Sequence, residues 1–402
     1  MISIRDLYRI GPGPSSSHTI GVKNAVDYIV GHYPDCQRVE MTFYGSLAKT
    51  GKGHLSDYIA ERAFKNLPHR IYFDAKTKTD HPNTMIFRVF RQDKKIETVT
   101  ILSIGGGLIR VKNRPEEKER QIYSENTFAE IKKFCADNRC TLIDYIYRCE
   151  GKEIDAYMEE ILSAMMTSVE NGLNKSGVLP GKLKVQRKAG EMYRHFDFGE
   201  TPEMREKRLI CAYAFAVSEE NASGQQIVTA PTCGSSGVLP SLVKHRLNQG
   251  AERQKVIEGL LVAGLFGLLV KTNASISGAE CGCQAEIGTA SAMGAAFLAY
   301  LDGQNIEGIE RAAEIALEHS LGLTCDPIGG YVQIPCIERN AMGAMKSLTS
   351  CAMSRFMGKS NSKISFDVVV ETMYRTGRDI NLRYRETAQG GLAEVYHAER
   401  HK

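Results

Sequence analysis

EIDAYMEEILSAMMTSVENGL, residues 153–173, marks the point where the character of the chain changes. Its apolar residues recur three or four positions apart and define one helical face: Ile154, Met158, Ile161, Leu162 and Met165. GVLPG at 177–181 ends this pattern. Further helical patterns, separated by Gly- and Pro-rich loops, lie near 204–219, 236–248, 251–271, 284–301, 307–320 and 362–376. We therefore predict a mostly all-α domain over residues 151–402.

The region before this boundary has a mixed pattern. A helix is predicted to start near Ser17 or His18, with one apolar face made of Val22, Ala25, Val26, Ile29 and Val30. Alternation at Val39, Met41 and Phe43 predicts a half-buried strand. More strands are expected at 70–73, 85–89 and 96–104, and more helices at 126–136 and 141–149. The predicted fold class is thus an α+β domain over residues 1–150, a sheet with helices, followed by the helical domain.

The composition is that of a soluble globular protein. The 402 residues carry 51 Lys and Arg against 47 Asp and Glu, a net charge of +4 without a long basic block, so nucleic-acid binding is not predicted. The start, MISIRDLYRIGPGP, is charged where a signal peptide would be apolar. The longest apolar stretch, 260–270, is too short to span a membrane. Eleven cysteines without a secretion signal favour free thiols in a reducing cytoplasm.

Three cysteines in Gly- and Pro-rich sequence are candidate metal ligands. Cys283 stands in GAECGCQAEIG, Cys325 in LGLTCDPIGG and Cys336 in VQIPCIERN. Thiolates on such loops can converge on a soft metal, and three of them would leave one iron of a [4Fe–4S] cluster open. Their spacing matches no ferredoxin or zinc-ribbon motif, and a free cysteine is more often a small buried apolar residue. Spacing alone leaves both interpretations open.

Seven segments, in order along nearly the whole chain, resemble the iron–sulfur L-serine dehydratases. They are GPSSSHTIG (13–21), YGSLAKTGKGH (44–54), SIGGG (103–107), APTCGSSGVLP (230–240), SGAECGCQAEIG (277–288), EHSLGLTCDPIGGYVQIPCIERNAMGAMKS (318–347) and RETAQGGLA (385–393). The resemblance implies a single-chain, cytoplasmic L-serine ammonia-lyase of amino-acid catabolism that forms pyruvate and ammonia. It implies a [4Fe–4S] cluster held by Cys283, Cys325 and Cys336, with Cys283 preferred to Cys281. It also implies a homodimer. The composition and the apolar pattern predict no membrane or nucleic-acid partner.

The segment PSSSHT at 14–19 is the first candidate substrate site. A proline followed by serines is typical of a helix start, with Ser16 or Ser17 as the N-cap. Free N–H groups at a helix N-terminus suit a carboxylate. The same serines can equally serve only to cap the helix. Because of the resemblance, we assign the binding of L-serine to Ser15, Ser16, Ser17 and Thr19.

Two histidines are candidates for proton transfer. His54 closes the Gly-rich segment GSLAKTGKGH at 45–54 and is the first choice as general acid or base, because imidazole titrates in the useful range. His18 is the second choice. Asn171 and Arg339 are candidates for binding the amino or carboxylate group of the substrate, although a structural role fits each of them equally well.

Two alternative functions stay open from the sequence. The same cluster could act on L-threonine or L-cysteine, since one methyl group or a sulfur atom is distinguished only by the shape of a pocket. The chain could instead be a non-catalytic amino-acid or redox sensor. Nucleotide binding is not predicted, because the chain contains neither GxxxxGK[ST] nor GxGxxG.

Overall fold

The computed structural model describes residues 1–92, 94–114, 121–357 and 362–400. The chain forms two compact units. The larger unit contains residues 1–10, 120–222 and 226–402, and the smaller unit contains residues 11–119 and 223–225. The sequence analysis places residues 120–150 in the first domain, whereas in the structure they group with the helices of the larger unit.

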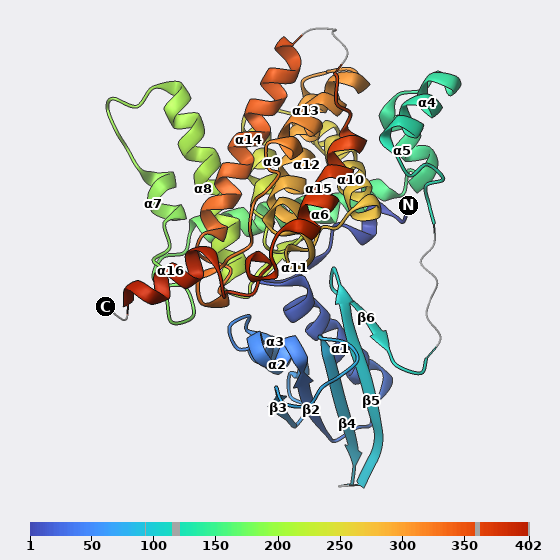
Figure 1. Cartoon of the computed structure of the whole chain (residues 1–402), viewed down its shortest axis with the longest axis vertical. Helices are drawn as coiled ribbons and strands as arrows, with labels where there is room; N and C mark the ends of the chain where they lie inside the picture. The colour runs from blue at the N-terminus through green and yellow to red at the C-terminus, as the bar shows by residue number, and fades with distance from the viewer. Residues whose placement is uncertain (93, 115–120, 358–361, 401–402) are drawn as a thin grey trace. The chain divides into compact units, whose positions relative to one another are not determined.

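The smaller unit is built on a five-stranded sheet with the order β3-β2-β4-β5-β6 (Figure 1). Its strands are β2 (Arg38–Tyr44), β3 (His69–Asp74), β4 (Thr84–Arg91), β5 (Lys94–Gly105) and β6 (Leu108–Val111). β2 and β3 are parallel, and the other neighbours are antiparallel. The predicted alternation in β2 is confirmed, because Val39, Met41 and Phe43 are buried. The short strand β1 (Ile10–Pro12) precedes this sheet in the chain.

Helix α1 (Gly21–His32) shares a hydrophobic core with the sheet of the smaller unit. The buried face contains four of the five predicted residues, but Val30 is exposed, so that part of the prediction is wrong. The start of α1 approaches β5 so closely that a Cβ atom at Gly21 would lie 2.3 Å from Ser103 Oγ. Two further helices, α2 (Gly45–Thr50) and α3 (Ser56–Phe64), connect β2 to β3.

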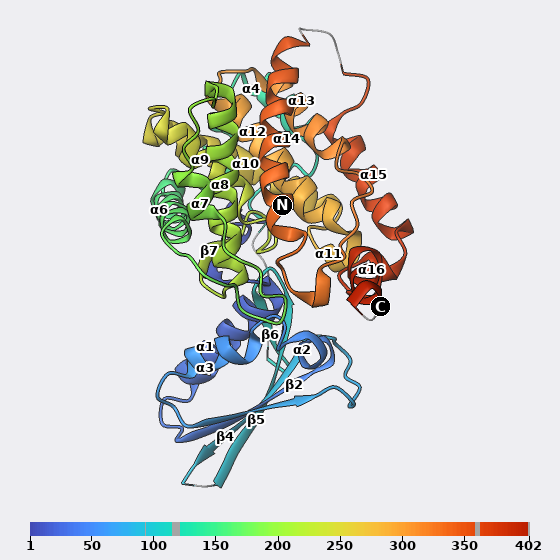
Figure 2. The same ribbon diagram turned by 90° about the vertical axis from the view of Figure 1, so that its left-hand side faces the viewer.

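The larger unit is rich in helices (Figures 1 and 2). They are α4 (Phe128–Asn138), α5 (Leu142–Glu150), α6 (Ile154–Leu173), α7 (Ala189–Arg194), α8 (Pro202–Ala222), α9 (Val238–Asn248), α10 (Arg253–Asn273), α11 (Gly278–Cys281), α12 (Thr289–Leu301), α13 (Ile306–Glu318), α14 (Cys336–Phe356), α15 (Phe366–Asp379) and α16 (Gly391–Arg400). One short strand, β7 (Gln226–Val228), lies among them, so the region is helix-rich but not purely helical.

Helix α10 is buried along most of its length in the larger unit. By length and composition alone it could cross a membrane, but 78% of its most apolar window is buried inside the protein, which is typical of a core helix. The small residues of α12 allow close helix packing. A Cβ atom at Gly294 would lie 2.5 Å from Ser347 Oγ of α14, and one at Gly259 of α10 would lie 2.8 Å from the Phe297 ring of α12.

The first ten residues belong to this helical core. The amino group of Met1 donates a hydrogen bond to the Tyr123 carbonyl (2.6 Å), and the Tyr8 hydroxyl donates to the Leu260 carbonyl in α10 (2.9 Å). Ile4 and Tyr8 are completely buried. The chain therefore begins in the larger unit, passes through the smaller one and returns.

Candidate active site

Three cysteines from separate segments converge in the larger unit. Cys283 is the N-cap residue of a π-helical turn, Gln284–Gly288, that leads into α12. Cys336 is the first residue of α14, and Cys325 lies in the loop between α13 and α14. The three thiols lie close enough for the charge on one to affect the pKa of another. We call Cys283, Cys325 and Cys336 the thiol group.

The surroundings of the thiol group disfavour free thiolates. Burial raises the pKa of Cys283 to about 11, with a further increase from the Glu286 carboxylate and an opposing effect of Arg339. Burial also raises the pKa values of Cys325 and Cys336, and the neighbouring thiols add to both shifts. Three thiols that interact electrostatically in a poorly solvated environment become thiolates together only if a cation compensates their charge, and a soft metal supplies that compensation.

The donor set of the thiol group fits an iron–sulfur cluster. In the part of the chain that the structure describes, no three His, Cys, Asp or Glu side chains form a site for a single metal ion. A four-iron cluster does not need such a site, because each thiolate binds a different iron. All eleven cysteines are free thiols, so no disulfide competes for these three.

Cys281 has a different environment from Cys283. It packs against α15, where a Cβ atom at Gly377 would lie 2.6 Å from the Cys281 sulfur. Burial raises its pKa, and the charges that modify this shift come from Glu280 and Arg385. The contacts that define the thiol group therefore involve Cys283, and those of Cys281 are contacts of helix packing.

Two carboxylates that the sequence analysis did not select lie beside the thiol group. Glu286 accepts a hydrogen bond from the Thr232 hydroxyl (2.7 Å), and its other oxygen lies 4.0 Å from Cys325 Sγ. Glu386 has φ of +58°, and its N–H donates to the Cys325 carbonyl (2.7 Å). Burial raises the pKa of Glu386 to about 8, and the Glu286 carboxylate increases the shift. A left-handed backbone at a residue other than glycine is a recurrent feature of functional sites.

Arg339 belongs to the same cluster of side chains. Its guanidinium donates to the Thr324 carbonyl (2.6 Å), to Asp326 Oδ1 (3.1 Å) and to the sulfur of Cys283. These bonds fix the guanidinium beside the thiol group. Asn171, the other candidate for substrate binding, has an exposed side chain on α6 and is absent from the contacts that define this cluster among the described residues.

The predicted histidines come together in the smaller unit. The rings of His18 and His54 are stacked, with centroids 4.5 Å apart. Both side chains are buried, and burial lowers the pKa of each, that of His18 well below its usual value. The charge of His54 contributes further to the shift at His18. Both rings are therefore neutral at physiological pH.

The hydrogen bonds define which ring nitrogen of each histidine carries the proton. His54 Nδ1 lies 3.1 Å from the Thr50 carbonyl, which can only accept, so Nδ1 carries the hydrogen. His54 Nε2 is then unprotonated and carries a lone pair. This nitrogen is buried without a hydrogen-bond partner among the described residues. The Thr50 hydroxyl donates to the Ser46 carbonyl and therefore accepts from His18 Nε2 (2.9 Å). His18 Nδ1 accepts from the Ser15 hydroxyl (3.3 Å).

The serine segment forms the entry to α1. Ser15, rather than Ser16 or Ser17, is the N-cap residue, and it leads into a π-helical turn over Ser16–Ile20. The Thr19 hydroxyl contacts the carbonyls of Pro12 (2.7 Å) and Ser15 (2.5 Å) within this turn. Thr19 therefore stabilises the turn, whereas Ser15 is linked to His18.

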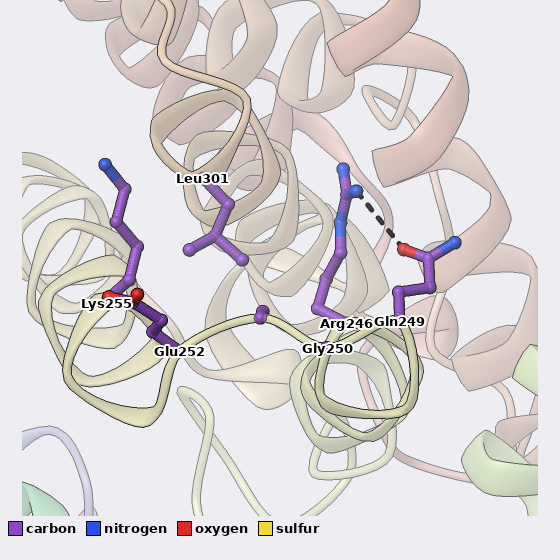
Figure 3. A pocket seen from close by; sticks show the side chains of 7 residues that line it. Arg246, Gln249, Gly250, Glu252, Lys255 and Leu301 are labelled. Carbon is purple, nitrogen blue, oxygen red and sulfur yellow. Dashed lines mark hydrogen bonds between the residues drawn. The ribbon is translucent and has the colours of Figure 1, made fainter.

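A separate pocket of about 340 Å³ lies where α9 meets α10 (Figure 3). Arg246 and Lys255 line it together with Gln249, and Figure 3 shows Lys255 on the opposite side from Arg246. Arg246 is already paired with Asp302 (2.6 Å). The residues that line this pocket include no member of the thiol group.

Comparison with known proteins gives the family of the chain. Converging thiols in a helix-rich unit, in a chain that also contains an α+β unit, define a candidate thiolate-ligated metalloenzyme. The family model described as "Serine dehydratase alpha chain" matches residues 75–393, and "Serine dehydratase beta chain" matches residues 3–60. The chain belongs to the L-serine dehydratase family, in its single-chain form.

Curated relatives agree with this assignment over almost their whole length. The chain is 37% identical to the L-serine dehydratase of Haemophilus influenzae (98% of this chain, 99% of the relative) and 37% identical to that of Helicobacter pylori J99 (98% of both). It is 36% identical to L-serine dehydratase 2 of Escherichia coli K12 (98% of both). The names of these relatives do not favour the alternative substrates or the sensor.

Proposed function

We propose that this chain is an L-serine ammonia-lyase that eliminates water from L-serine to give pyruvate and ammonia, using a [4Fe–4S] cluster. The observation that carries the proposal is the convergence of Cys283 with Cys325 and Cys336, which lie at the two ends of one loop, beside a guanidinium and a carboxylate. The family and the names of the relatives support serine as the substrate.

Cys283, Cys325 and Cys336 would hold the cluster. When bound, such a cluster with one iron free of cysteine supplies a Lewis acid for the β-hydroxyl group, which is otherwise a poor leaving group. The protein provides the remaining requirements. Arg339 donates to the Cys283 sulfur and counters the negative charge of the thiolates. The loop between Cys325 and Cys336 is anchored by the bond from Arg339 to Asp326.

The smaller unit contains a candidate base and a candidate carboxylate-binding segment. His54 Nε2 is unprotonated and has no hydrogen-bond partner among the described residues, which suits removal of the α-proton of serine. His18 orients Ser15 through its Nδ1 atom. The turn that begins at Ser15 would bind the substrate carboxylate through Ser15, Ser16 and Ser17, with Thr19 holding its shape.

We further propose a cytoplasmic homodimer. Three aromatic side chains are between 75% and 97% exposed: Phe196 and Phe198 in the loop before α8, and Phe356 at the end of α14. Large exposed aromatic side chains favour a protein–protein contact. Sedimentation equilibrium of the purified protein tests this point, and a monomer at micromolar concentration would contradict it.

The test of function is anaerobic purification, with iron, sulfide and serine-dependent pyruvate measured in one sample. About four irons per chain, as a [4Fe–4S] cluster requires, with pyruvate formed from L-serine, is the expected result. Pyruvate formation by protein that lacks iron would refute the proposed role of the cluster. A full cluster in protein that eliminates water from no small amino acid would refute the proposed activity.

A further inference from the structure

The carboxylate of Glu286 lies beside the thiol group, in a space that two glycines leave open. A Cβ atom at Gly234 would lie 2.7 Å from Glu286 Oε1, and one at Gly278 would lie 2.6 Å from Oε2. Any side chain at either glycine would therefore displace the carboxylate. Three segments, around residues 232–234, 278–286 and 325, meet at this one group.

The two oxygens of Glu286 differ in their partners. Oε1 accepts a strong hydrogen bond from Thr232 (2.7 Å), which fixes the orientation of the carboxylate. The contact of Oε2 is the Cys325 sulfur at 4.0 Å, a distance at which a thiol is at most a weak donor. The Glu286 residue is partly exposed to solvent.

Oε2 has no strong hydrogen-bond donor among the described residues, since its one hydrogen-bond contact there is the Cys325 sulfur at 4.0 Å. The charge of Arg339 acts on Glu286, but the hydrogen bonds of Arg339 go to Thr324, Asp326 and Cys283. A partly buried carboxylate oxygen without a strong donor is suited to accept one from a bound cationic group.

We propose that Glu286 binds the α-ammonium group of the substrate through Oε2, and so selects amino acids over the corresponding hydroxy acids. The inference rests on the proposed function, because it assigns one more substrate contact to the same site. The ammonium group has three N–H donors and a positive charge, which suit a carboxylate oxygen that lacks a strong hydrogen-bond donor. Glu286 is then a binding residue, and the cysteines remain the only proposed cluster ligands.

The test compares the wild type with Glu286→Gln after anaerobic reconstitution. The amide keeps an oxygen for Thr232 and nearly the same shape, but it removes the charge. Glu280→Gln, which removes an exposed carboxylate six residues earlier, is the matched control. Three quantities are measured for each protein: the iron content with the absorption spectrum, the calorimetric affinity for L-serine, and the kcat and KM for pyruvate formation.

The expected result is unchanged iron and spectrum in Glu286→Gln, with affinity for L-serine reduced roughly 10- to 100-fold and a matching rise in KM. Glu280→Gln should behave as the wild type. Loss of iron in Glu286→Gln would overturn the assignment in favour of a role in holding the cluster. Unchanged serine affinity would overturn it as well. A wild type with full cluster that binds no serine would instead refute the proposed function, so the two failures are distinguishable.

A second comparison uses D- and L-glycerate, in which a hydroxyl group replaces the ammonium, as competitors of L-serine. In the wild type both should inhibit at least tenfold more weakly than L-serine binds. In Glu286→Gln the difference should shrink towards equality, because the charge that favours the ammonium is gone. An undiminished preference for serine in this variant would show that the selection is made elsewhere.

Discussion

The two units assemble their chemical groups in opposite ways. In the smaller unit, His18, His54 and the residues that hold them lie within one continuous segment between residues 15 and 56. In the larger unit, the thiol group and its carboxylates come from segments spread between residues 232 and 386. A site made from one segment depends on local hydrogen bonds, whereas a site made from distant segments depends on the packing of the whole unit.

The largest effect is expected at the thiol group. Changing Cys325 or Cys336 to Ala should remove cluster and activity together, because two thiolates are too few to retain four irons. Iron analysis and the pyruvate assay measure the two losses. Cys281→Ala is the matched control, since Cys281 packs against Gly377 of α15, and it should keep both. Full activity in either ligand variant would refute the cluster assignment.

His54 provides the corresponding test in the smaller unit. His54→Asn should lower kcat about 100- to 10,000-fold, the usual contribution of a general base, and leave the iron content and the absorption spectrum unchanged. Such a result would show that His54 contributes to turnover and not to holding the cluster. His32→Asn serves as the control, because His32 is exposed on α1 and stacks on Tyr28. A near-normal kcat for His54→Asn would exclude His54 as the base.

A pair of glycine substitutions compares packing in the two units. Gly377→Ala in α15 should destabilise the protein by about 1–3 kcal/mol, since the added methyl group would overlap Cys281. Gly31→Ala in α1 has open space around the added Cβ and should be neutral or stabilising by about 0.5–1 kcal/mol. Urea unfolding measures both values. Equal effects would show that the tight contact at Gly377 relaxes without cost.

The smallest effect concerns acid stability. Burial lowers the pKa values of His18 and His54 below their usual 6.5, so the unfolded chain takes up protons at a pH where the folded chain does not. Their contribution to stability is therefore complete above about pH 6.5 and decreases as the pH falls, by at most about 1.4 kcal/mol per histidine and pH unit. Thermal unfolding between pH 7.5 and 5.5 should be less pH-dependent in His54→Asn than in the wild type. An identical pH dependence would contradict the assignment.

Sequence patterns predicted the elements that have a clear apolar period. β2 alternates strictly, and α10 is apolar throughout its buried length, so both were found. Helix α14 was missed because its buried face is made of small and polar residues, among them Ala344, Ser347 and Ser350. Such a face packs well against α12 but carries no hydrophobic period.

Candidate site residues could be selected from the sequence only where the residue type itself indicates a chemical role. The three cysteines and two histidines were selected for their type, and the structure brings the members of each set together. Glu286 and Glu386 stand in the same family segments, yet a glutamate is too common in a chain with 47 acidic residues to be selected without its contacts. Their significance depends on distances to Cys325 that only the folded chain defines.

The packing of residues 1–10 into the larger unit has a consequence for biosynthesis. Tyr8 is synthesised some 250 residues before its hydrogen-bond partner, the Leu260 carbonyl. The smaller unit, whose residues 11–119 follow at once, can form most of its contacts during translation, since domains fold as units while the chain is being made. The first ten residues can reach their final packing only after α10 has been synthesised. A nascent chain halted before α10 should therefore leave its N-terminus accessible to proteases while the smaller unit is already protected.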